Sequence, residues 1–268
     1  MSNAVIVKPL PLAAVTASSS AAGYDPSYIG NDHMGVVWKS GGGVASQTLL
    51  VDMGGDVAAD TLLLLGCTGA NAGWTLRVQA ATAAQGPSFA SGFWDSGDMP
   101  FLAGAIMPKT GRGRALWLTP AGGGPPSSRY WRITIGGLSG APVVVARLVL
   151  GLAMRLARNF QFGGAFGIRD LSQVDFSARG VLLRRRGVKL RSIGLTFGSV
   201  YKDEVEAAVH PLIEEVGNSE PIAVITDADA DAQRQNRIWF GPIVGDLGTV
   251  WAKPGGFEWR VAVVSLNA

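Results

Sequence analysis

The sequence has little charge, little histidine and almost no cysteine. Only 16% of its 268 residues are charged, two are histidines and one, Cys67, is a cysteine. A single thiol cannot form an internal disulfide, and the two histidines lie at no spacing that binds zinc. We therefore predict no metal site and no cofactor. The net charge of +3 is small for this length and predicts no nucleic acid partner.

Long apolar runs are missing too. No segment reaches the roughly 18 uninterrupted apolar residues of a membrane-spanning helix, and the best stretch, residues 143–157, contains Arg147 and Arg155. The apolar residues 10–17 resemble the core of a signal peptide, but two prolines and the lack of a cleavage box disagree with that interpretation. We expect no membrane insertion, and synthesis in the cytoplasm without a signal peptide.

Glycine and strand-like alternation dominate the middle of the chain. The chain has 37 glycines and a mean hydropathy of +0.24. This composition is too apolar for disorder and favours short strands joined by glycine turns over a helical bundle. Apolar and polar residues alternate over 74–81 and over 131–135, which is the period of a half-buried strand. The sequence therefore predicts an all-β domain over residues 24–152.

The chain on either side of this domain has a different character. Residues 1–23 are predicted to be an extended arm, because their prolines forbid a regular helix. Residues 153–268 are predicted to form a small α+β domain. Its helix, 203–216, begins with acidic residues and carries an apolar stripe, and Pro211 should kink it. Strands are predicted over 174–178, 187–197, 221–226, 237–244 and 257–266.

Two segments resemble catalytic or metal-binding motifs without completing them. The acidic run 227–231 lacks the glycine and the glutamate of a calcium-binding EF-hand loop, because Ala232 and Ile238 occupy those positions. Ser139 lies between two predicted strands, whereas a nucleophile elbow needs a helix after the serine. We therefore predict that the chain is not an enzyme, and we assign no catalytic residue.

The positive charge is concentrated at one place, and a pair of carboxylates at another. Arg184, Arg185 and Arg186 are consecutive, and on a strand their side chains would point to both faces. We predict a solvated hairpin or a salt-bridged subunit contact there, not a phosphate-binding track.

Asp95 and Asp98 flank a Ser-Gly pair, which predicts a turn.

One polar loop has the composition of a sugar-binding site. It combines Tyr28 with Asn31, Asp32 and His33. An aromatic ring can stack on a sugar while amide, carboxylate and imidazole groups bind its hydroxyls. The alternative is an ordinary loop that anchors the first strand of the domain.

Several segments together resemble the discoidin, or galactose-binding-like, jelly roll. They are Trp38, residues 48–54, the Arg-Tyr-Trp-Arg-Ile-Thr-Ile stretch at 129–135, and residues 147–151. The resemblance implies a β-sandwich jelly roll followed by the small α+β domain. It also implies glycan binding through loops at one end of the barrel, here 31–33 and 93–97. The glycan contacts predicted in this way are Tyr28, Asn31, Asp32, His33 and Trp94.

The chain as a whole resembles minor tail or baseplate proteins of tailed bacteriophages. This resemblance implies a structural virion protein at the tail tip or baseplate, whose partners are other tail proteins, copies of itself and host-surface glycan. The single cysteine departs from many secreted discoidin domains, which close the barrel with a disulfide. A stand-alone carbohydrate-binding module of an exported glycan-recognition system is the alternative. A glycan hydrolase would require two carboxylates about 5–10 Å apart in a cleft.

Overall fold

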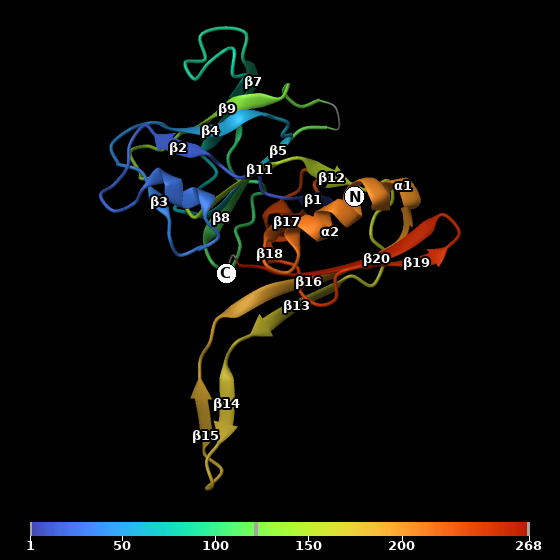
Figure 1. Cartoon of the computed structure of the whole chain (residues 1–268). Helices are drawn as coiled ribbons and strands as arrows, with labels where there is room; N and C mark the ends of the chain where they lie inside the picture. The colour runs from blue at the N-terminus through green and yellow to red at the C-terminus, as the bar shows by residue number, and fades with distance from the viewer. Residues whose placement is uncertain (1, 121–122, 267–268) are drawn as a thin grey trace. The chain divides into compact units, whose positions relative to one another are not determined.

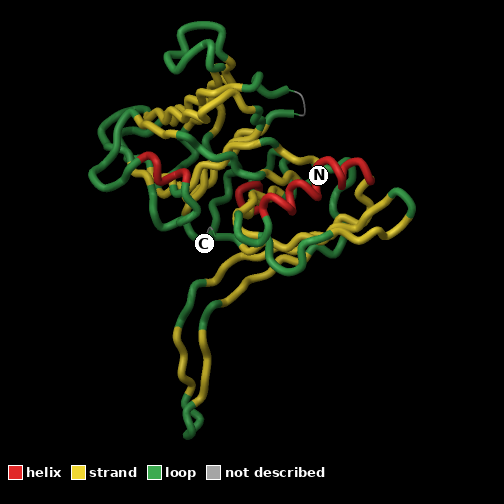
Figure 2. Tube along the Cα trace, viewed as in Figure 1, coloured by secondary structure: helices red, strands yellow, loops and turns green. Residues whose placement is uncertain are grey.

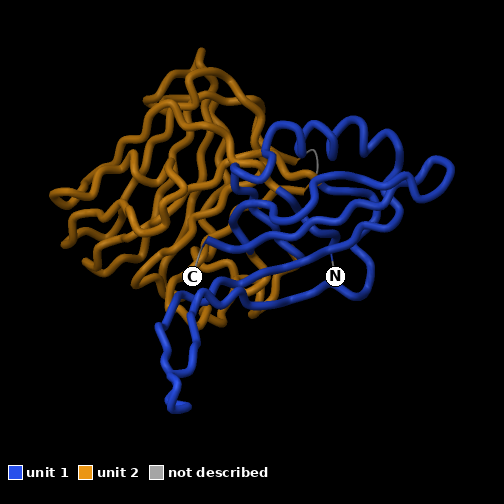
Figure 3. The backbone as a smooth tube through the Cα atoms, turned by 60° about the horizontal axis from the view of Figure 1, so that its bottom comes forward, with its two compact units in different colours: residues 1–6, 155–226, 239–268 blue, residues 7–154, 227–238 orange. Residues whose placement is uncertain are grey.

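The computed structural model describes residues 2–120 and 123–266. These residues form two compact units, coloured separately in Figure 3. Unit 1 comprises residues 1–6, 155–226 and 239–268, and unit 2 comprises residues 7–154 and 227–238. The predicted domain boundary after residue 152 thus falls two residues before a crossing from unit 2 to unit 1. Nothing in the sequence indicates that residues 227–238 belong to unit 2.

Unit 2 is a β-sandwich of two antiparallel five-stranded sheets, which confirms the predicted fold class (Figure 1). The first sheet has the order β2-β4-β9-β6-β7, and we call it the polar-faced sheet; its strands are β2 (Ala14–Ala17), β4 (Gln47–Val57), β9 (Ser128–Gly136), β6 (Thr75–Ala81) and β7 (Trp94–Pro100). The second has the order β11-β5-β10-β3 with β8 paired to β5; its strands are β11 (Arg147–Gly151), β5 (Thr61–Thr68), β10 (Val144–Val145), β3 (Trp38–Lys39) and β8 (Arg112–Leu118). Two short 3-10 helices complete the unit, η1 (Pro26–Gly30) and η3 (Arg234–Arg237).

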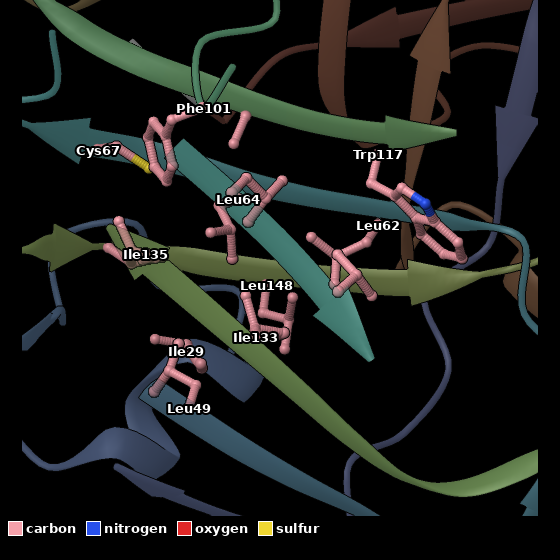
Figure 4. Close-up of a cluster of buried hydrophobic side chains, with 14 of the residues drawn as sticks. Ile29, Leu49, Leu62, Leu64, Cys67, Phe101, Trp117, Ile133, Ile135 and Leu148 are labelled. Carbon is pink, nitrogen blue, oxygen red and sulfur yellow. The ribbon is translucent and has the colours of Figure 1, made fainter. Parts of the chain in front are cut away.

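The core of unit 2 lies between the inner faces of the two sheets (Figure 4). Ile133 and Ile135 of β9 meet Leu62 and Leu64 of β5 there, and all four side chains are fully buried. Cys67 is also part of this cluster, and burial raises the pKa of its thiol. Because every second residue of these strands enters the core, the residues between them are directed to the opposite face.

The chain start contributes a strand to each unit. β1 (Val5–Val7) is buried, and it lies next to β17 (Pro221–Ile225) in one sheet. β2 pairs with β4 at the edge of the polar-faced sheet. The residues predicted to be an extended arm are therefore extended, and they pair as strands.

Asp95 and Asp98 lie within strand β7, so the predicted turn between them is wrong. The local turn chemistry is nevertheless present, because Asp95 Oδ1 accepts a hydrogen bond from the Gly97 N–H (2.8 Å). It forms a bulge in the strand, where the pairing register with β6 shifts between Arg77 and Gln79. The Asp-Ser-Gly-Asp sequence thus bends a strand without ending it.

Unit 1 contains a four-stranded sheet of order β13-β16-β20-β19; its strands are β13 (Ala165–Asp170), β16 (Lys189–Tyr201), β20 (Gly256–Val264) and β19 (Thr249–Lys253). β17 and β18 (Ile238–Pro242) are neighbours in another sheet, and β12 (Ala153–Arg155) lies where the chain passes from unit 2 to unit 1. β13 falls in a segment, before residue 174, where the sequence predicts no strand. The strands predicted after residue 220 are all present.

The predicted helix 203–216 is present and is distorted before its proline. It consists of α1 (Lys202–Glu204), a π-helical turn η2 (Val205–Val209) and α2 (His210–Val216). The His210 N–H donates to the Val205 carbonyl, five residues earlier, directly before Pro211. A π turn is one of the ways in which a helix accommodates a residue that disrupts the regular hydrogen-bond pattern. No helix in the described part of the chain is long and apolar enough to span a membrane.

The three consecutive arginines lie on a two-stranded hairpin, in agreement with the prediction of a solvated hairpin. Its strands are β14 (Gln173–Phe176) and β15 (Leu182–Arg185), and within the described part of the chain they pair only with each other. Figure 2 shows them as a narrow ribbon that extends beyond the sheet of β13 and β16. Every residue of both strands is exposed.

Gly66 produces a bulge in the central strand β5. Its φ is +69°, and the pairing register of β5 with β8 shifts between Leu64 and Cys67. A methyl group at Gly66 would lie 2.7 Å from the Cβ of buried Ala146, whereas nothing lies within 4 Å at Gly69, whose φ is +81°. Both glycines therefore avoid backbone strain, and only Gly66 also avoids a collision.

We predict that Gly66→Ala destabilises the protein more than Gly69→Ala. Gly69→Ala should lower the free energy of unfolding by about 1 kcal/mol through its left-handed backbone, and Gly66→Ala by about 1–3 kcal/mol more through overpacking. Urea unfolding of the two variants measures the difference. Equal losses would show that the Ala146 methyl group moves aside freely.

Candidate functional site

The outer side of the polar-faced sheet carries polar side chains on its central strands. Thr75, Arg77 and Gln79 alternate with core residues of β6, and Arg132 and Thr134 alternate with core residues of β9. The strand register places Gln79 opposite Arg132 and Arg77 opposite Thr134. Residues about fifty positions apart in the sequence therefore become neighbours on one surface.

A chain of hydrogen bonds joins four of these side chains across three strands. Arg77 binds Asp95 through two nitrogens, with Nε 3.0 Å from Oδ1 and Nη2 2.6 Å from Oδ2. Gln79 Nε2 donates to Asp95 Oδ2 (2.6 Å), and Arg132 Nε donates to Gln79 Oε1 (2.6 Å). We call this set, Arg77, Asp95, Gln79 and Arg132, the ladder. Because its charged bonds are short and one pair is bidentate, it holds each group in a defined position.

The ladder keeps Asp95 ionised. The hydrogen bond from Arg77 is the main reason why the pKa of this carboxyl falls to about 2, and bonds from the Gly97 N–H and from Gln79 lower it further against the effect of partial burial. Asp95 is therefore fully charged at neutral pH and acts as an acceptor only. It is a positioning group for Gln79, which in turn orients Arg132.

Arg132 is at the end of the ladder and retains unused donors. Its guanidinium carbon lies 4.3 Å from the centre of the Phe89 ring and 5.7 Å from that of Phe93. Burial lowers the pKa of Arg132. Among the described residues, neither of its Nη atoms has a hydrogen-bond partner, and only Nε is engaged, by Gln79. A guanidinium fixed on one side by a hydrogen bond and a ring can donate from its free side to a ligand.

The loop between β6 and β7 brings the two phenylalanines to Arg132. Phe89 has a φ of 54°, an uncommon backbone conformation for a bulky residue, yet its side chain is only 5% exposed. Its ring meets that of Phe93 edge-on at 5.6 Å. Gln85 fastens the loop, since it accepts from the Thr82 N–H (2.8 Å) and donates to the Gly92 carbonyl (2.6 Å).

A hollow of about 560 Å³ lies on this face of the sheet. That is within the usual range for sites that bind small molecules. Its lining combines three hydroxyls, an amide, two guanidinium groups, a carboxylate and one glycine; these residues are Thr48, Thr75, Thr134, Gln79, Arg77, Arg132, Asp98 and Gly136. The hollow therefore offers both donors and acceptors to a hydroxyl-rich ligand.

The predicted loop 28–33 is held by a buried arginine. Arg147, whose side chain is 7% exposed, forms an ion pair with Asp32 (3.1 Å) and donates to the Ile29 carbonyl (3.1 Å). Asn31 Oδ1 accepts from the His33 N–H (2.8 Å). His33 is exposed, while Tyr28 lies half-buried in η1. In this structure Asn31 and Asp32 stabilise the loop, and His33 is the predicted contact most open to solvent.

Trp94, the fifth predicted contact, lies on a strand elsewhere in unit 2. It is half-buried in β7, with its ring edge-on to that of Trp117 at 5.3 Å. It lines a smaller hollow of about 330 Å³ together with Trp117, Ser96 and Arg234, among others. The helix η1 packs on β2, at one edge of the polar-faced sheet, whereas β7 is the opposite edge. The structure therefore does not bring Trp94 together with the loop 28–33.

The acidic run 227–231 and Ser139, which the sequence singled out, lie in turns or loops of unit 2. Arg237 binds both Asp227 (2.9 Å) and Asp231 (3.2 Å), so two carboxylates of the acidic run share one arginine. Ser139 has a φ of 48° in the connection between β9 and β10. Among the described residues, no group of three or more His, Cys, Asp or Glu side chains is arranged to hold a metal ion.

Sequence reasoning missed the ladder although its signal was present. The alternation over 74–81 and 131–135 predicts that Arg77, Gln79 and Arg132 lie on the face opposite to the core, but it does not distinguish a binding face from an ordinary solvent-exposed one. The pairing of Gln79 with Arg132 depends on strand register, and the approach of Phe89 depends on the loop after β6. Neither can be read from the local pattern.

Neither a protein-family model nor a curated protein matches this sequence. Several solved structures are similar to it, among them carbohydrate-binding modules and lectin domains. Chitosan-binding module 1 of a chitosanase/glucanase from Paenibacillus sp. IK-5 is 16% identical, with a TM-score of 0.40 over 53% of this chain and 97% of the module. The family 32 carbohydrate-binding module of C. perfringens NanJ, solved with galactose, is 14% identical, with a TM-score of 0.40 over 54% of this chain and 98% of that one.

Two further similarities concern a lectin domain and an enzyme chain. The lectin domain of lectinolysin, solved with Lewis b antigen, is 11% identical, with a TM-score of 0.38 over 53% of this chain and 93% of the domain. A GH29 fucosidase from Ruminococcus gnavus, solved with fucose, is 14% identical, with a TM-score of 0.39 over 53% of this chain. The match spans only 25% of the fucosidase.

We predict that Asp95→Asn destabilises the protein at neutral pH and not in strong acid. The folded-state pKa of Asp95, about 2, is below its ordinary value, so its ionisation stabilises the fold above the ordinary pKa of about 4, and this stabilisation is lost as the pH falls through about 2. Because the pair with Arg77 is partly exposed, we expect a loss of only about 1–2 kcal/mol at pH 7. Urea unfolding at pH values between 7 and 2 measures it.

Asp98→Asn is the matched control for this experiment. Asp98 lies on the same strand and is exposed. The control should change the free energy of unfolding little at any of these pH values. A deficit of Asp95→Asn that persists unchanged at pH 2 would contradict an origin in the charge of Asp95.

Proposed function

We propose that unit 2 binds carbohydrate on the outer side of the polar-faced sheet, with Arg132 as the central contact. The observation that supports this most is the partly buried Arg132 guanidinium, which the ladder fixes at a polar hollow with its Nη donors unused among the described residues. A sugar presents several hydroxyls that both donate and accept. Arg132 and Arg77 can donate to them, Asp98 can accept, and the threonines can do both.

The rigidity of the ladder favours binding without rearrangement. Asp95 fixes Arg77 and Gln79, and Gln79 fixes Arg132. Side chains that are already ordered lose little rotamer entropy when a ligand binds. The aromatic rings of Phe89 and Phe93 serve mainly to hold Arg132, because Phe89 is itself buried.

The loop 28–33 and Trp94 stay predictions as glycan contacts. The exposed His33 supports a second binding surface, and the hollow beside Trp94 supports a third. A substitution at each surface therefore distinguishes the three. We also propose that unit 2 acts by binding alone, without catalysis.

We predict that Arg132→Ala weakens glycan binding by about tenfold or more, because charge-assisted hydrogen bonds contribute about 1.5–3 kcal/mol each. The full chain is first applied to an array of neutral and acidic oligosaccharides, and the Kd for the strongest ligand is then measured by calorimetry. His33→Ala and Trp94→Ala should leave that Kd unchanged.

Arg112→Ala is the matched arginine control, since Arg112 is exposed on β8 and does not line the hollow. Binding that survives Arg132→Ala and is lost with His33→Ala would move the site to the predicted loop. Loss with Trp94→Ala alone would move it to the smaller hollow. Binding to no oligosaccharide of the array would contradict the proposal itself.

We further propose that the chain is a structural protein of a phage tail tip or baseplate, located in the virion and in contact with other tail proteins. The exposed hairpin of unit 1 supports this role, because it presents apolar side chains to solvent. Exposed apolar groups of this kind usually mark a surface that binds another molecule. Mass spectrometry and cryo-EM of purified tail particles test it. If the chain is absent from such particles, the virion role is refuted, and the alternative is a stand-alone carbohydrate-binding module of an exported glycan-recognition system.

A further inference from the structure

The hairpin of unit 1 has the same net charge as the complete protein. We define the hairpin arm as residues 171–188, whose four arginines and one aspartate give a charge of +3. The complete chain also has a net charge of +3, so the remaining residues are neutral in sum. Arg184, Arg185 and Arg186 account for most of this charge and are all exposed.

One side of the hairpin arm is apolar. The register pairs Phe176 with Leu182 and Val174 with Arg184, which puts these four side chains on the same side. Phe176 is 65% exposed and Val174 63%. An isolated two-stranded hairpin is marginally stable in water, and large exposed apolar groups mark surfaces that another molecule covers. The hairpin arm therefore needs a partner that is apolar and acidic.

The helical segment of the same unit has the opposite charge. Residues 202–220 contain six carboxylates and one lysine. We call this segment the acidic helix; its exposed carboxylates include Asp203, Glu214 and Glu215. Its apolar residues Val205 and Val209 are buried beneath it, so the acidic side chains form its outer surface.

An exposed apolar strand lies beside the acidic helix. His210 of α2 is hydrogen-bonded to Thr249 of β19 (2.8 Å), which fixes the helix next to that strand. Trp251, two residues after Thr249 on the same face of the strand, is 63% exposed. Among the described strands, β19 is the last of its sheet, and none of them pairs with its outer side. Acidic helix and β19 together make an apolar and acidic surface.

We propose that the hairpin arm of one copy of this chain docks on the acidic helix and β19 of a second copy. Charge complementarity and the exposed apolar groups on both surfaces carry this inference. In Figures 1 and 3 the arm extends away from the part of unit 1 that contains the helix, so an arm does not reach the helix of its own copy. Because the two surfaces differ, the contact either closes reciprocally in a two-fold dimer or repeats head-to-tail in a ring or a filament.

The inference rests on the proposed role as a structural protein and names the contact through which copies would assemble. It is tested on the full chain by sedimentation velocity across the micromolar range, at low and at high salt. We expect concentration-dependent association that high salt weakens, because the contact is partly electrostatic. Arg184→Glu with Arg185→Glu, and separately Glu214→Arg with Glu215→Arg, should each weaken self-association by about tenfold or more.

An equimolar mixture of the two double variants is the decisive sample. The reversed arm of one then meets the reversed helix of the other, and the unmodified arm of the second meets the unmodified helix of the first. Association should therefore return, with the two variants alternating. Positive charge near the C-terminal end of the helix suits its dipole, so the helix variant should fold, and circular dichroism verifies this. Lys109→Glu with Arg112→Glu, two exposed cations of unit 2, is the matched control and should associate like the unmodified chain.

Three outcomes would overturn the proposal: a chain that stays monomeric throughout, variants that associate like the unmodified chain, or a mixture that stays dissociated. Binding of the monomeric chain to anionic lipid vesicles through the arm would also overturn it. The measurement involves no sugar, so failure here leaves the glycan proposal intact. If the chain self-associates through this contact but is absent from tail particles, the virion role is refuted and the contact between copies still holds.

Discussion

The alternation of residues along β6 and β9 is the constraint on which unit 2 depends. On a strand, consecutive side chains point to opposite faces, so commitment of one face to the core fixes the other. The inner residues of these two strands are almost completely buried against β5 and its neighbours. A shift of register by one residue would place Arg132 in the core and Ile133 in solvent. The same packing that stabilises the sandwich therefore also aligns the polar side chains that form the candidate site.

Asp95 links the geometry of β7 to the chemistry of that site. Its carboxylate accepts from the Gly97 backbone in a bulge and simultaneously binds Arg77 and Gln79. The bulge turns the strand edge so that one carboxylate serves three donors. An extended, regular β7 would leave Gln79 without this partner and Arg132 without its orientation. The same hydrogen bonds lower the pKa of the Asp95 carboxyl, because they stabilise its ionised form.

Unit 1 differs from unit 2 in how it uses its surface. In unit 2 the ladder joins Arg77, Asp95, Gln79 and Arg132 into one hydrogen-bonded network. Unit 1 has two segments that are each rich in charge of one sign, with cations on the hairpin arm and carboxylates on the acidic helix. Charges of one sign on one element repel each other unless a partner neutralises them. This separation is physically reasonable for a chain whose surfaces meet other chains.

The sequence by itself determined the β-rich class, the strands of β6 and β9, the helix near Pro211 and the hairpin at the arginines. Each follows from a local pattern, namely alternation, an apolar stripe, or a charge run between strand-forming residues. Only the tertiary structure decided that residues 227–238 belong to unit 2, that Asp95 bends a strand instead of ending it, and that Gln79 meets Arg132. These features depend on strand register and on contacts between distant segments. The interactions that stabilise them join residues far apart in the sequence, so no local pattern reveals them.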